Sequence, residues 1–205
     1  MVTVVDHDEA WPARFEVMAT NVRSALGARA GLVEHIGSTA VPGLAAKPII
    51  DMLLTVDDVT DEASYVSPLE PFGFGLRVRE PDHRMLRTAE RDVHLHVYEG
   101  DRPEVRDYLD LRDWLCEDAN DRSLYAATKR HLAGREWSDM NYYADAKDQV
   151  VAELLTRARA WRAGQRASSS GGRSRHPTVH QRITRRAAPG EVERAMAAVI
   201  LKRWR

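Results

Sequence analysis

The chain reads HIGSTAVPGLAAKPIID from His35 to Asp51, a turn of small residues that leads into an apolar strand with one acidic residue. Gly37 and Ser38 let the backbone pass close to a phosphate group, which the backbone N–H groups of such turns bind. Asp51 lies between apolar neighbours and is costly to bury without a cation. The stretch therefore predicts a phosphate-binding turn, formed by Gly37, Ser38 and Thr39, beside a catalytic carboxylate that holds a metal ion.

The position two residues after Asp51 is a leucine, Leu53. Residues i and i+2 of a strand point to the same face, and paired carboxylates at this spacing hold the divalent ions of phosphoryl and nucleotidyl transfer. Leu53 supplies no metal ligand. This strand alone therefore cannot build a two-ion site, and further ligands must come from elsewhere.

Two histidines, His94 and His96, alternate with apolar residues in the clearest predicted strand, residues 93–98. Alternation places both on one face, and if this strand lies beside that of Asp51, the three side chains can converge on a divalent ion. Imidazole suits zinc, iron, nickel or manganese better than magnesium, and the sequence leaves the identity of the ion open, with Mg, Mn and Zn as candidates. In the alternative interpretation, both histidines face solvent on a half-exposed strand.

Lys47 and Asp51 each have a structural alternative. Lys47 lies near the turn, where its ammonium group would meet either a phosphate or the Asp51 carboxylate. Without a metal, Asp51 would be paired with a base such as Lys47 or Arg84. Basic residues on the later predicted helices are weaker candidates for contact with an anionic substrate, because most such side chains are solvated. They are Arg112, Lys129, Arg130 and Lys147.

Charge divides the chain into an acidic body and a basic tail. With 205 residues, 43% hydrophobic and 30% charged, it can bury a core and is expected to hold one principal domain, residues 1–163. This body has 20 Lys/Arg against 29 Asp/Glu, net −9, whereas residues 164–205 have 10 against 2, net +8. Segment 164–190, with six arginines and no acid, predicts a flexible linker, and the spacing over 191–205 predicts a short amphipathic helix.

The tail and the composition also bear on partners and location. An arginine-rich segment binds nucleic acid through phosphate contacts, but it can also lie against the acidic body or be an extension without a partner, and we favour these two. Residues 1–11 lack the layout of a signal peptide, no segment is long enough to span a membrane, and one cysteine permits no internal disulfide. We therefore expect a cytoplasmic protein with no membrane partner.

Hydrophobic periodicity predicts helices at both ends of the body and strands between them. The predicted helices cover residues 11–26, 57–69, 103–116, 122–132 and 139–161. The predicted strands cover residues 31–36, 48–56, 74–79, 84–89 and 93–98.

At these residues the chain resembles the GrpB family, small proteins assigned to the nucleotidyltransferase superfamily and also found fused to dephospho-CoA kinase. The resemblance spans roughly residues 5–160, and no P-loop supports kinase activity. It implies an α+β fold, a nucleotidyltransferase-like mixed sheet with an N-terminal helix and a C-terminal helical part. The matching residues are the 35–51 stretch, Trp11-Pro12 with Phe15, His94-Leu95-His96-Val97, Arg112-Asp113 with the Lys129 region, and Lys147.

The resemblance also suggests two functions. Superfamily members typically have Gly-Ser, then about a dozen residues, then Asp-x-Asp or Asp-x-Glu; Gly37-Ser38 and Asp51 match this frame, and Leu53 departs from it. The first hypothesis is a metal-dependent enzyme that transfers a nucleotidyl or related phosphate-bearing group to a small acceptor. The second is a non-catalytic module that binds a nucleotide, another phosphorylated ligand or a partner through a degenerate transferase site.

Overall fold

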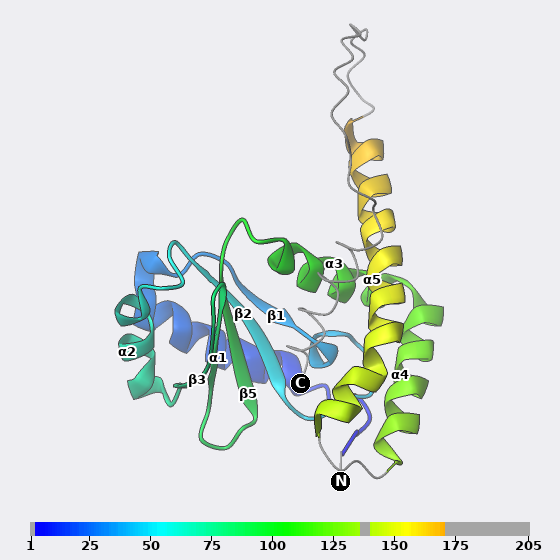
Figure 1. Ribbon diagram of the computed structural model, residues 1–205, viewed down its shortest axis with the longest axis horizontal. Helices are drawn as coiled ribbons and strands as arrows, with labels where there is room; N and C mark the ends of the chain where they lie inside the picture. Colours follow the sequence, from blue (N-terminus) through cyan, green and yellow to red (C-terminus); the bar gives the residue numbers. More distant parts are fainter. Residues whose placement is uncertain (1–2, 136–139, 171–205) are drawn as a thin grey trace, which may run out of the picture.

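A five-stranded mixed sheet lies at the centre of the computed structural model, which describes residues 3–135 and 140–170, with side chains for 3–135 and 148–168 (Figure 1). The strand order is β1-β2-β5-β4-β3. The strands are Val33–Ile36 (β1), Ile50–Val56 (β2), Gly75–Glu80 (β3), His83–Arg87 (β4) and Val93–Glu99 (β5). The larger helices are Trp11–Leu26 (α1), Pro103–Glu117 (α3), Ala119–Ala133 (α4) and Met140–Ser170 (α5), and Val66–Leu69 (α2) is a single turn.

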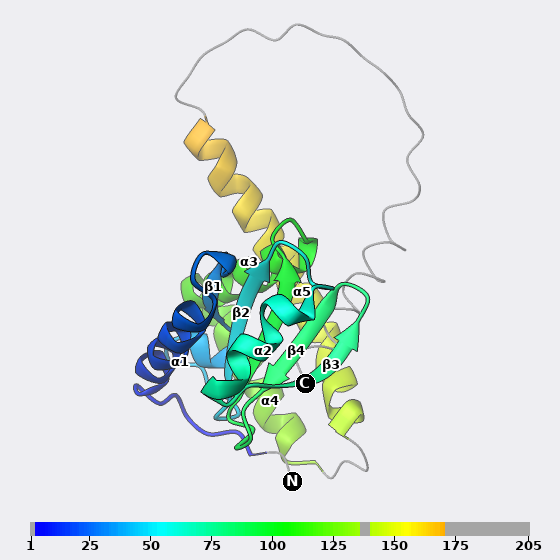
Figure 2. The ribbon, with the colours of Figure 1, turned by 90° about the vertical axis from the view of Figure 1, so that its left-hand side faces the viewer.

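The sheet separates two packed layers. α1 covers one face, where Trp11 and Phe15 join a core that includes Met52 and Leu54 of β2 (Figure 2). α3 covers the other face, and α4 and α5 pack beyond it. The expected α+β architecture, with an N-terminal helix and a helical C-terminal part around a mixed sheet, is confirmed.

β2 and β5 are parallel neighbours in the middle of the sheet. Their register places Asp51 opposite His94 and Leu53 opposite His96. Because successive side chains of a strand point to opposite faces, these four residues share the face covered by α3. Ion pairs tie α3 to α5: both oxygens of the buried Asp107 accept hydrogen bonds from Arg159, each at 2.7 Å.

Both edge strands of the sheet have features that oppose pairing with a further strand. On β1, Arg23 donates to the Val33 carbonyl at 3.1 Å and Arg112 donates to the His35 carbonyl at 2.9 Å. On β3, the pairing with β4 is irregular between Leu76 and Val78. Edge strands with these features are poor templates for another strand.

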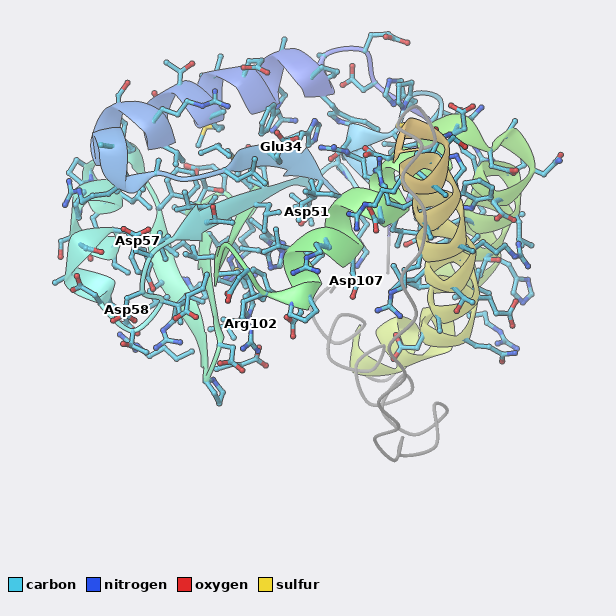
Figure 3. All side chains as sticks on the ribbon, turned by 90° about the horizontal axis from the view of Figure 1, so that it is seen from above. Glu34, Asp51, Asp57, Asp58, Arg102 and Asp107 are labelled. Atoms are coloured by element: carbon cyan, nitrogen blue, oxygen red, sulfur yellow. The ribbon has the colours of Figure 1, made fainter. Side chains whose placement is uncertain are left out.

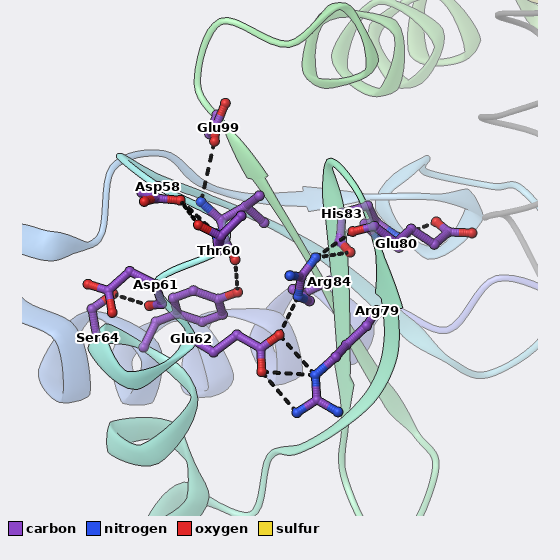
Figure 4. A network of polar contacts seen from close by, with 12 residues as sticks. Asp58, Thr60, Asp61, Glu62, Ser64, Arg79, Glu80, His83, Arg84 and Glu99 are labelled. Carbon is purple, nitrogen blue, oxygen red and sulfur yellow. Dashed lines mark hydrogen bonds and ion pairs between the residues drawn. The ribbon is translucent and has the colours of Figure 1, made fainter.

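Most predicted elements are present, with one clear error. α1 has the expected bounds, and each strand lies within two residues of its prediction at either end. The helix expected over 57–69 is wrong, because only the 3-10 turn Glu62–Ser64 and α2 are helical. The Asp58 carboxylate accepts hydrogen bonds from the amide and hydroxyl of Thr60, each at 2.7 Å, and such local bonds compete with a helix (Figure 4).

The last helix is longer than the predicted helix over residues 139–161. α5 continues to Ser170, past the boundary expected at residue 163. The remainder of the expected linker, and the helix expected over 191–205, lie outside the described residues. Within the described residues, no helix has the length and apolar character needed to cross a membrane.

Candidate metal and phosphate site

Asp51, His94 and His96 come together on the face covered by α3. Asp51 Oδ1 lies 3.4 Å from His94 Nδ1 and 3.8 Å from His96 Nε2. The three ligand atoms all lie within 4.8 Å of one another. The parallel pairing of β2 and β5 produces this convergence, because it sets Asp51 directly opposite His94.

The geometry of these three residues fits a shared cation. Two ligands about 2.1 Å from one ion at a tetrahedral angle lie about 3.4 Å apart, close to the observed separations. Burial alone would raise the pKa of Asp51, but the neighbouring imidazoles of His94 and His96 hold this pKa well below its usual range. The ionised form that a cation requires is therefore favoured. The Asp51 side chain is 30% exposed, so solvent reaches the carboxylate.

The histidines are more buried than expected of a polar strand face. His94 is 8% exposed and His96 is 4% exposed. The ring of Tyr108, from α3, lies 5.7 Å from the ring of His96. The alternative of two solvent-facing histidines is therefore wrong, because α3 covers the face that carries them.

Gly37 brings the small-residue turn directly against Asp51. It has a φ of +73°, and a Cβ atom built on it would lie 2.6 Å from Asp51 Oδ2. Ser38 follows at the start of the 3-10 turn Ser38–Ala40 and is partly exposed. The turn and the carboxylate predicted from the 35–51 stretch are thus neighbours, and the space between them admits no side chain at position 37.

The side chain of Thr39 makes its contacts in the interior. Its hydroxyl donates to the Ile49 carbonyl at 3.0 Å and lies 3.1 Å from His35 Nε2. The hydroxyl has one proton, so His35 donates to it from Nε2. Thr39 is 1% exposed, so its side chain lies in the interior, and the part of Thr39 in the phosphate-binding turn stays a prediction. Its hydrogen bonds hold the turn against the start of β2.

Lys47 and Arg84 have different relations to Asp51. Burial lowers the pKa of Lys47, and the negative charge of Asp51 opposes this effect, so the two groups act on each other. Arg84 instead donates to Glu62 Oε1 at 2.6 Å (Figure 4). Of the two bases considered as partners for Asp51, only Lys47 interacts with it.

Arg87 is a basic residue near the site that sequence reasoning missed. It pairs in register with His94, so both side chains lie on the same face of the sheet. Arg87 Nε is buried and has no hydrogen-bond partner among the described residues. Burial lowers its pKa, and the like charges of Arg91 and Arg77 add to this effect. Arg87 could be assigned to the site only from the register of β4 against β5, and the sequence alone does not give this register.

The basic residues of the later helices have structural contacts. Arg112 donates to Glu34 at 2.7 Å and to Asp113 at 2.9 Å. Lys129 is buried with its ammonium group 4.4 Å from the ring centroid of Tyr125. Arg130 pairs with Asp6 at 2.6 Å, and the side chain of Lys147 lies outside the described residues.

A separate cavity of about 470 Å³ lies beside β1, between α3 and the end of α5. Its lining includes Glu34 of β1. None of Asp51, His94 and His96 lines it. Arg112 in its wall is already paired with acids, so this cavity is a weaker anion site than the turn at Gly37.

Sequence reasoning also missed His83 and Glu80, which extend the polar face beyond His96. His83 Nε2 lies 3.1 Å from His96 Nδ1, and His83 Nδ1 lies 3.0 Å from Glu80 Oε2. His83 is 2% exposed. The polar face therefore crosses four strands: Asp51 on β2, His94 and His96 on β5, His83 on β4 and Glu80 on β3. We call these five residues the polar row.

Relatives of known sequence cover most of the body of the chain. A UPF0157 protein from Halalkalibacterium halodurans is 47% identical over 162 residues, which cover 78% of this chain and 83% of that protein. A dephospho-CoA kinase from Mycolicibacterium paratuberculosis is 28% identical over 189 residues. That match covers 78% of this chain and 46% of the kinase, so related sequence occurs as one part of a longer protein.

A solved structure and a family model show the family of this chain. The crystal structure of the conserved protein GrpB from Enterococcus faecalis matches with a TM-score of 0.71 and 30% identity, over 78% of this chain and 99% of that one. A structure of the Cid1 poly(U) polymerase matches with a TM-score of 0.48 and 15% identity, over 65% of this chain and 45% of that one. A model of the family described as GrpB protein matches residues 1–157. The chain belongs to the GrpB family.

Proposed function

We propose that this protein binds a divalent metal ion through Asp51, His94 and His96 and a nucleotide or related phosphorylated ligand at the adjacent turn. The activity that this site supports best is transfer of a nucleotidyl or related phosphate-bearing group to a small acceptor. The observation that carries the proposal is the convergence of one carboxylate and two imidazoles beside Gly37.

The donor set favours particular ions. Two imidazole nitrogens and one carboxylate oxygen suit zinc or manganese, whereas magnesium prefers a shell of oxygen ligands. A bound ion would neutralise charge on phosphate oxygens, which is the main requirement in nucleotidyl transfer. Asp51 supports this role because its pKa lies below the usual range.

The chain's own groups would position the phosphates. Gly37 lets the backbone of the turn lie against Asp51 where a side chain would collide with it, and Ser38, the next residue, is partly exposed. Lys47 and Arg87 supply positive charge near the site, and Arg87 Nε has no partner among the described residues. Phosphate oxygens are suitable acceptors for both cationic groups.

The proposal is tested by titrating Mn²⁺ and Zn²⁺ separately into the protein in a calorimeter, followed by a thermal-shift screen of nucleotides with and without the ion. We expect Asp51→Asn to lose metal binding, because it removes the charged ligand. Asp57→Asn is the matched control, since Asp57 is an exposed acid just beyond the far end of β2 (Figure 3). Unchanged metal affinity in Asp51→Asn would refute the site.

Arg87 allows the phosphate contacts to be tested separately from the metal. We expect Arg87→Gln to weaken nucleotide binding about tenfold, the loss of one charge-assisted contact, and to leave metal affinity unchanged. Arg91→Gln is the comparison, because Arg91 lies on the following turn and is exposed. Equal losses in both variants would indicate a general charge effect instead of a contact from Arg87.

A non-catalytic binding module is the second candidate, and the environment of Leu53 favours it. Leu53 is 0% exposed and packs with Ile36, Tyr98 and Tyr108. The position at which superfamily members typically have a second acid is thus occupied by a residue of the hydrophobic core. A binding module predicts nucleotide binding without turnover, so a labelled product from a panel of nucleotides and small acceptors would exclude it.

A further inference from the structure

Beyond His96 the polar row continues through His83 to Glu80, which is at the end of β3. The Glu80 side chain is 36% exposed, whereas that of His83 is 2% exposed. Two contacts, of 3.0 and 3.1 Å, join the carboxylate to His83 and His83 to His96. A buried imidazole thus connects a partly exposed carboxylate to a candidate metal ligand.

The ionised carboxylate of Glu80 determines which atoms donate and which accept along these two contacts. An ionised carboxylate only accepts hydrogen bonds, so Glu80 requires the proton of His83 on Nδ1. A neutral imidazole carries one N–H, so His83 Nε2 is then an acceptor and His96 Nδ1 must donate to it. His96 Nε2 is left with a lone pair, and this atom is the one 3.8 Å from Asp51 Oδ1.

The packing around His83 leaves its ring little freedom. The Tyr98 ring stacks on it with centroids 4.7 Å apart, and the His96 ring stacks at 5.3 Å. Arg84 donates to the carbonyls of both Glu80 and His83 and so fastens the hairpin between β3 and β4 (Figure 4). Outside the metal site, the ring of Tyr98 and the hairpin between β3 and β4 therefore help to fix the position of the His83 imidazole.

We propose that Glu80 and His83 are positioning residues that set the tautomer of His96, so that His96 Nε2 is free to bind the ion. The inference rests on the proposed metal site and adds two residues to it. A ligating histidine commonly donates its other ring N–H to a fixed acceptor, which sets the tautomer and strengthens the ligand. In the opposite tautomer, His96 would donate from Nε2 to Asp51 and could not coordinate a metal.

The first experiment measures the tautomer directly. In metal-free wild-type protein at neutral pH, the ring ¹⁵N shifts of His96, read by long-range proton–nitrogen correlation, should show protonated Nδ1 and unprotonated Nε2. A His96 protonated on Nε2 in the wild type would overturn the inference. This result does not depend on whether an ion binds, so it separates the inference from the proposed function.

The second experiment replaces the Glu80 carboxylate, which sets the direction of the two hydrogen bonds. In Glu80→Gln the amide can donate to His83 Nδ1, which reverses both hydrogen bonds. We expect the His96 shifts to move toward the Nε2–H form and Zn²⁺ affinity to fall about 10- to 100-fold, the usual cost of losing such a partner. Glu80→Asp should recover part of the wild-type behaviour. Glu90→Gln, on the exposed turn before β5, is the matched control and should change neither readout.

His83→Phe removes both ring nitrogens and keeps a ring against Tyr98. We expect it to retain a cooperative melt and to give a mixture of His96 tautomers with weakened Zn²⁺ binding. A wild-type tautomer in both Glu80→Gln and His83→Phe would overturn the inference, whatever the metal affinity. If the tautomer shifts as expected in a protein that binds no ion, the positioning role is supported and the metal proposal fails.

Discussion

Gly37 and Asp51 act as one unit at the scale of single residues. The glycine adopts a φ that side chains disfavour and lies where its hydrogen atoms alone fit against the carboxylate. The carboxylate in turn lies between this turn and two imidazoles. A single substitution at position 37 therefore tests the geometry of the site without removing any ligand.

Gly37→Ala should lower both stability and metal affinity. A side chain at this backbone conformation costs about 1–3 kcal/mol, and its Cβ would also displace Asp51 Oδ2 from 2.6 Å. Gly43→Ala is the control, because Gly43 has the same φ of +73° and no atom within 4 Å of a built Cβ. Metal titrations and urea unfolding of both variants check this. Equal metal affinity in the two would contradict the contact with Asp51.

Leu53→Asp should destabilise the protein instead of restoring a two-ion site. The added carboxylate would be buried among apolar side chains, which costs at least about 3 kcal/mol. Leu53→Met should cost less than about 1.5 kcal/mol because it nearly conserves volume. Urea unfolding distinguishes them. A Leu53→Asp variant as stable as the wild type would show that the core tolerates the second acid.

His35 should make stability depend on pH. Burial lowers its pKa from 6.5 to about 4, with Asp51 opposing and Arg112 adding to the shift. Between these values the unfolded chain binds the proton and the folded chain does not. The stabilisation from neutral His35 is therefore complete above pH 6.5 and is lost as pH falls toward 4.

Urea unfolding between pH 4 and 7 measures this dependence. His35→Gln keeps a donor for Thr39 but does not titrate, so its stability should vary less with pH than that of the wild type. His131→Gln serves for comparison, because His131 is exposed on α4. A wild-type slope retained in His35→Gln would show that another group is responsible.

The sequence predicts part of the site at this scale. Strand alternation was enough to predict that His94 and His96 lie on one face of their strand. The parallel pairing of β2 with β5 then places Asp51 on the same face of the sheet, opposite His94. Glu80 and His83 were not predicted, because the contact of His83 with His96 depends on the register of β4 against β5. The Thr39 hydroxyl donates to a buried carbonyl, a contact that no local pattern reveals.

At the scale of elements, α3 covers the polar row and α5 holds α3 in place. The buried Asp107 forms two hydrogen bonds with Arg159, and Arg162 donates to Asp110 at 2.7 Å. Periodicity predicted these helices well, because long amphipathic patterns are little affected by context. The helix predicted over residues 57–69 was wrong because Asp58 and its neighbours form local hydrogen bonds, which hydrophobic periodicity does not reveal.

Arg159→Leu should destabilise the protein by about 3 kcal/mol, because it leaves the Asp107 carboxylate buried without its partner. The double variant Asp107→Leu/Arg159→Leu should recover most of this loss, since it also removes the stranded charge. Chemical denaturation of the two variants and the wild type checks the cycle. A double variant less stable than Arg159→Leu would mean that Asp107 has a further partner.

At the scale of the whole molecule, the sheet is the shared support of every feature of the site. Its two middle strands supply Asp51, His94 and His96, and its outer strand β3 supplies Glu80. Its other outer strand, β1, carries the two carbonyls bound by Arg23 and Arg112. The sheet thus places the candidate metal ligands on its inner strands, and the two carbonyls at the edge of β1 are bound by arginine side chains.

These arginine contacts have a consequence for behaviour at high concentration. A second copy of the chain cannot add a strand along β1 while guanidinium groups hold the carbonyls of Val33 and His35. The double variant Arg23→Ala/Arg112→Ala should therefore form thioflavin-binding fibres or soluble strand-paired oligomers, detected by light scattering, where the wild type remains monodisperse. We therefore expect resistance to fibre growth to depend on Arg23 and Arg112, the two side chains at the edge of β1.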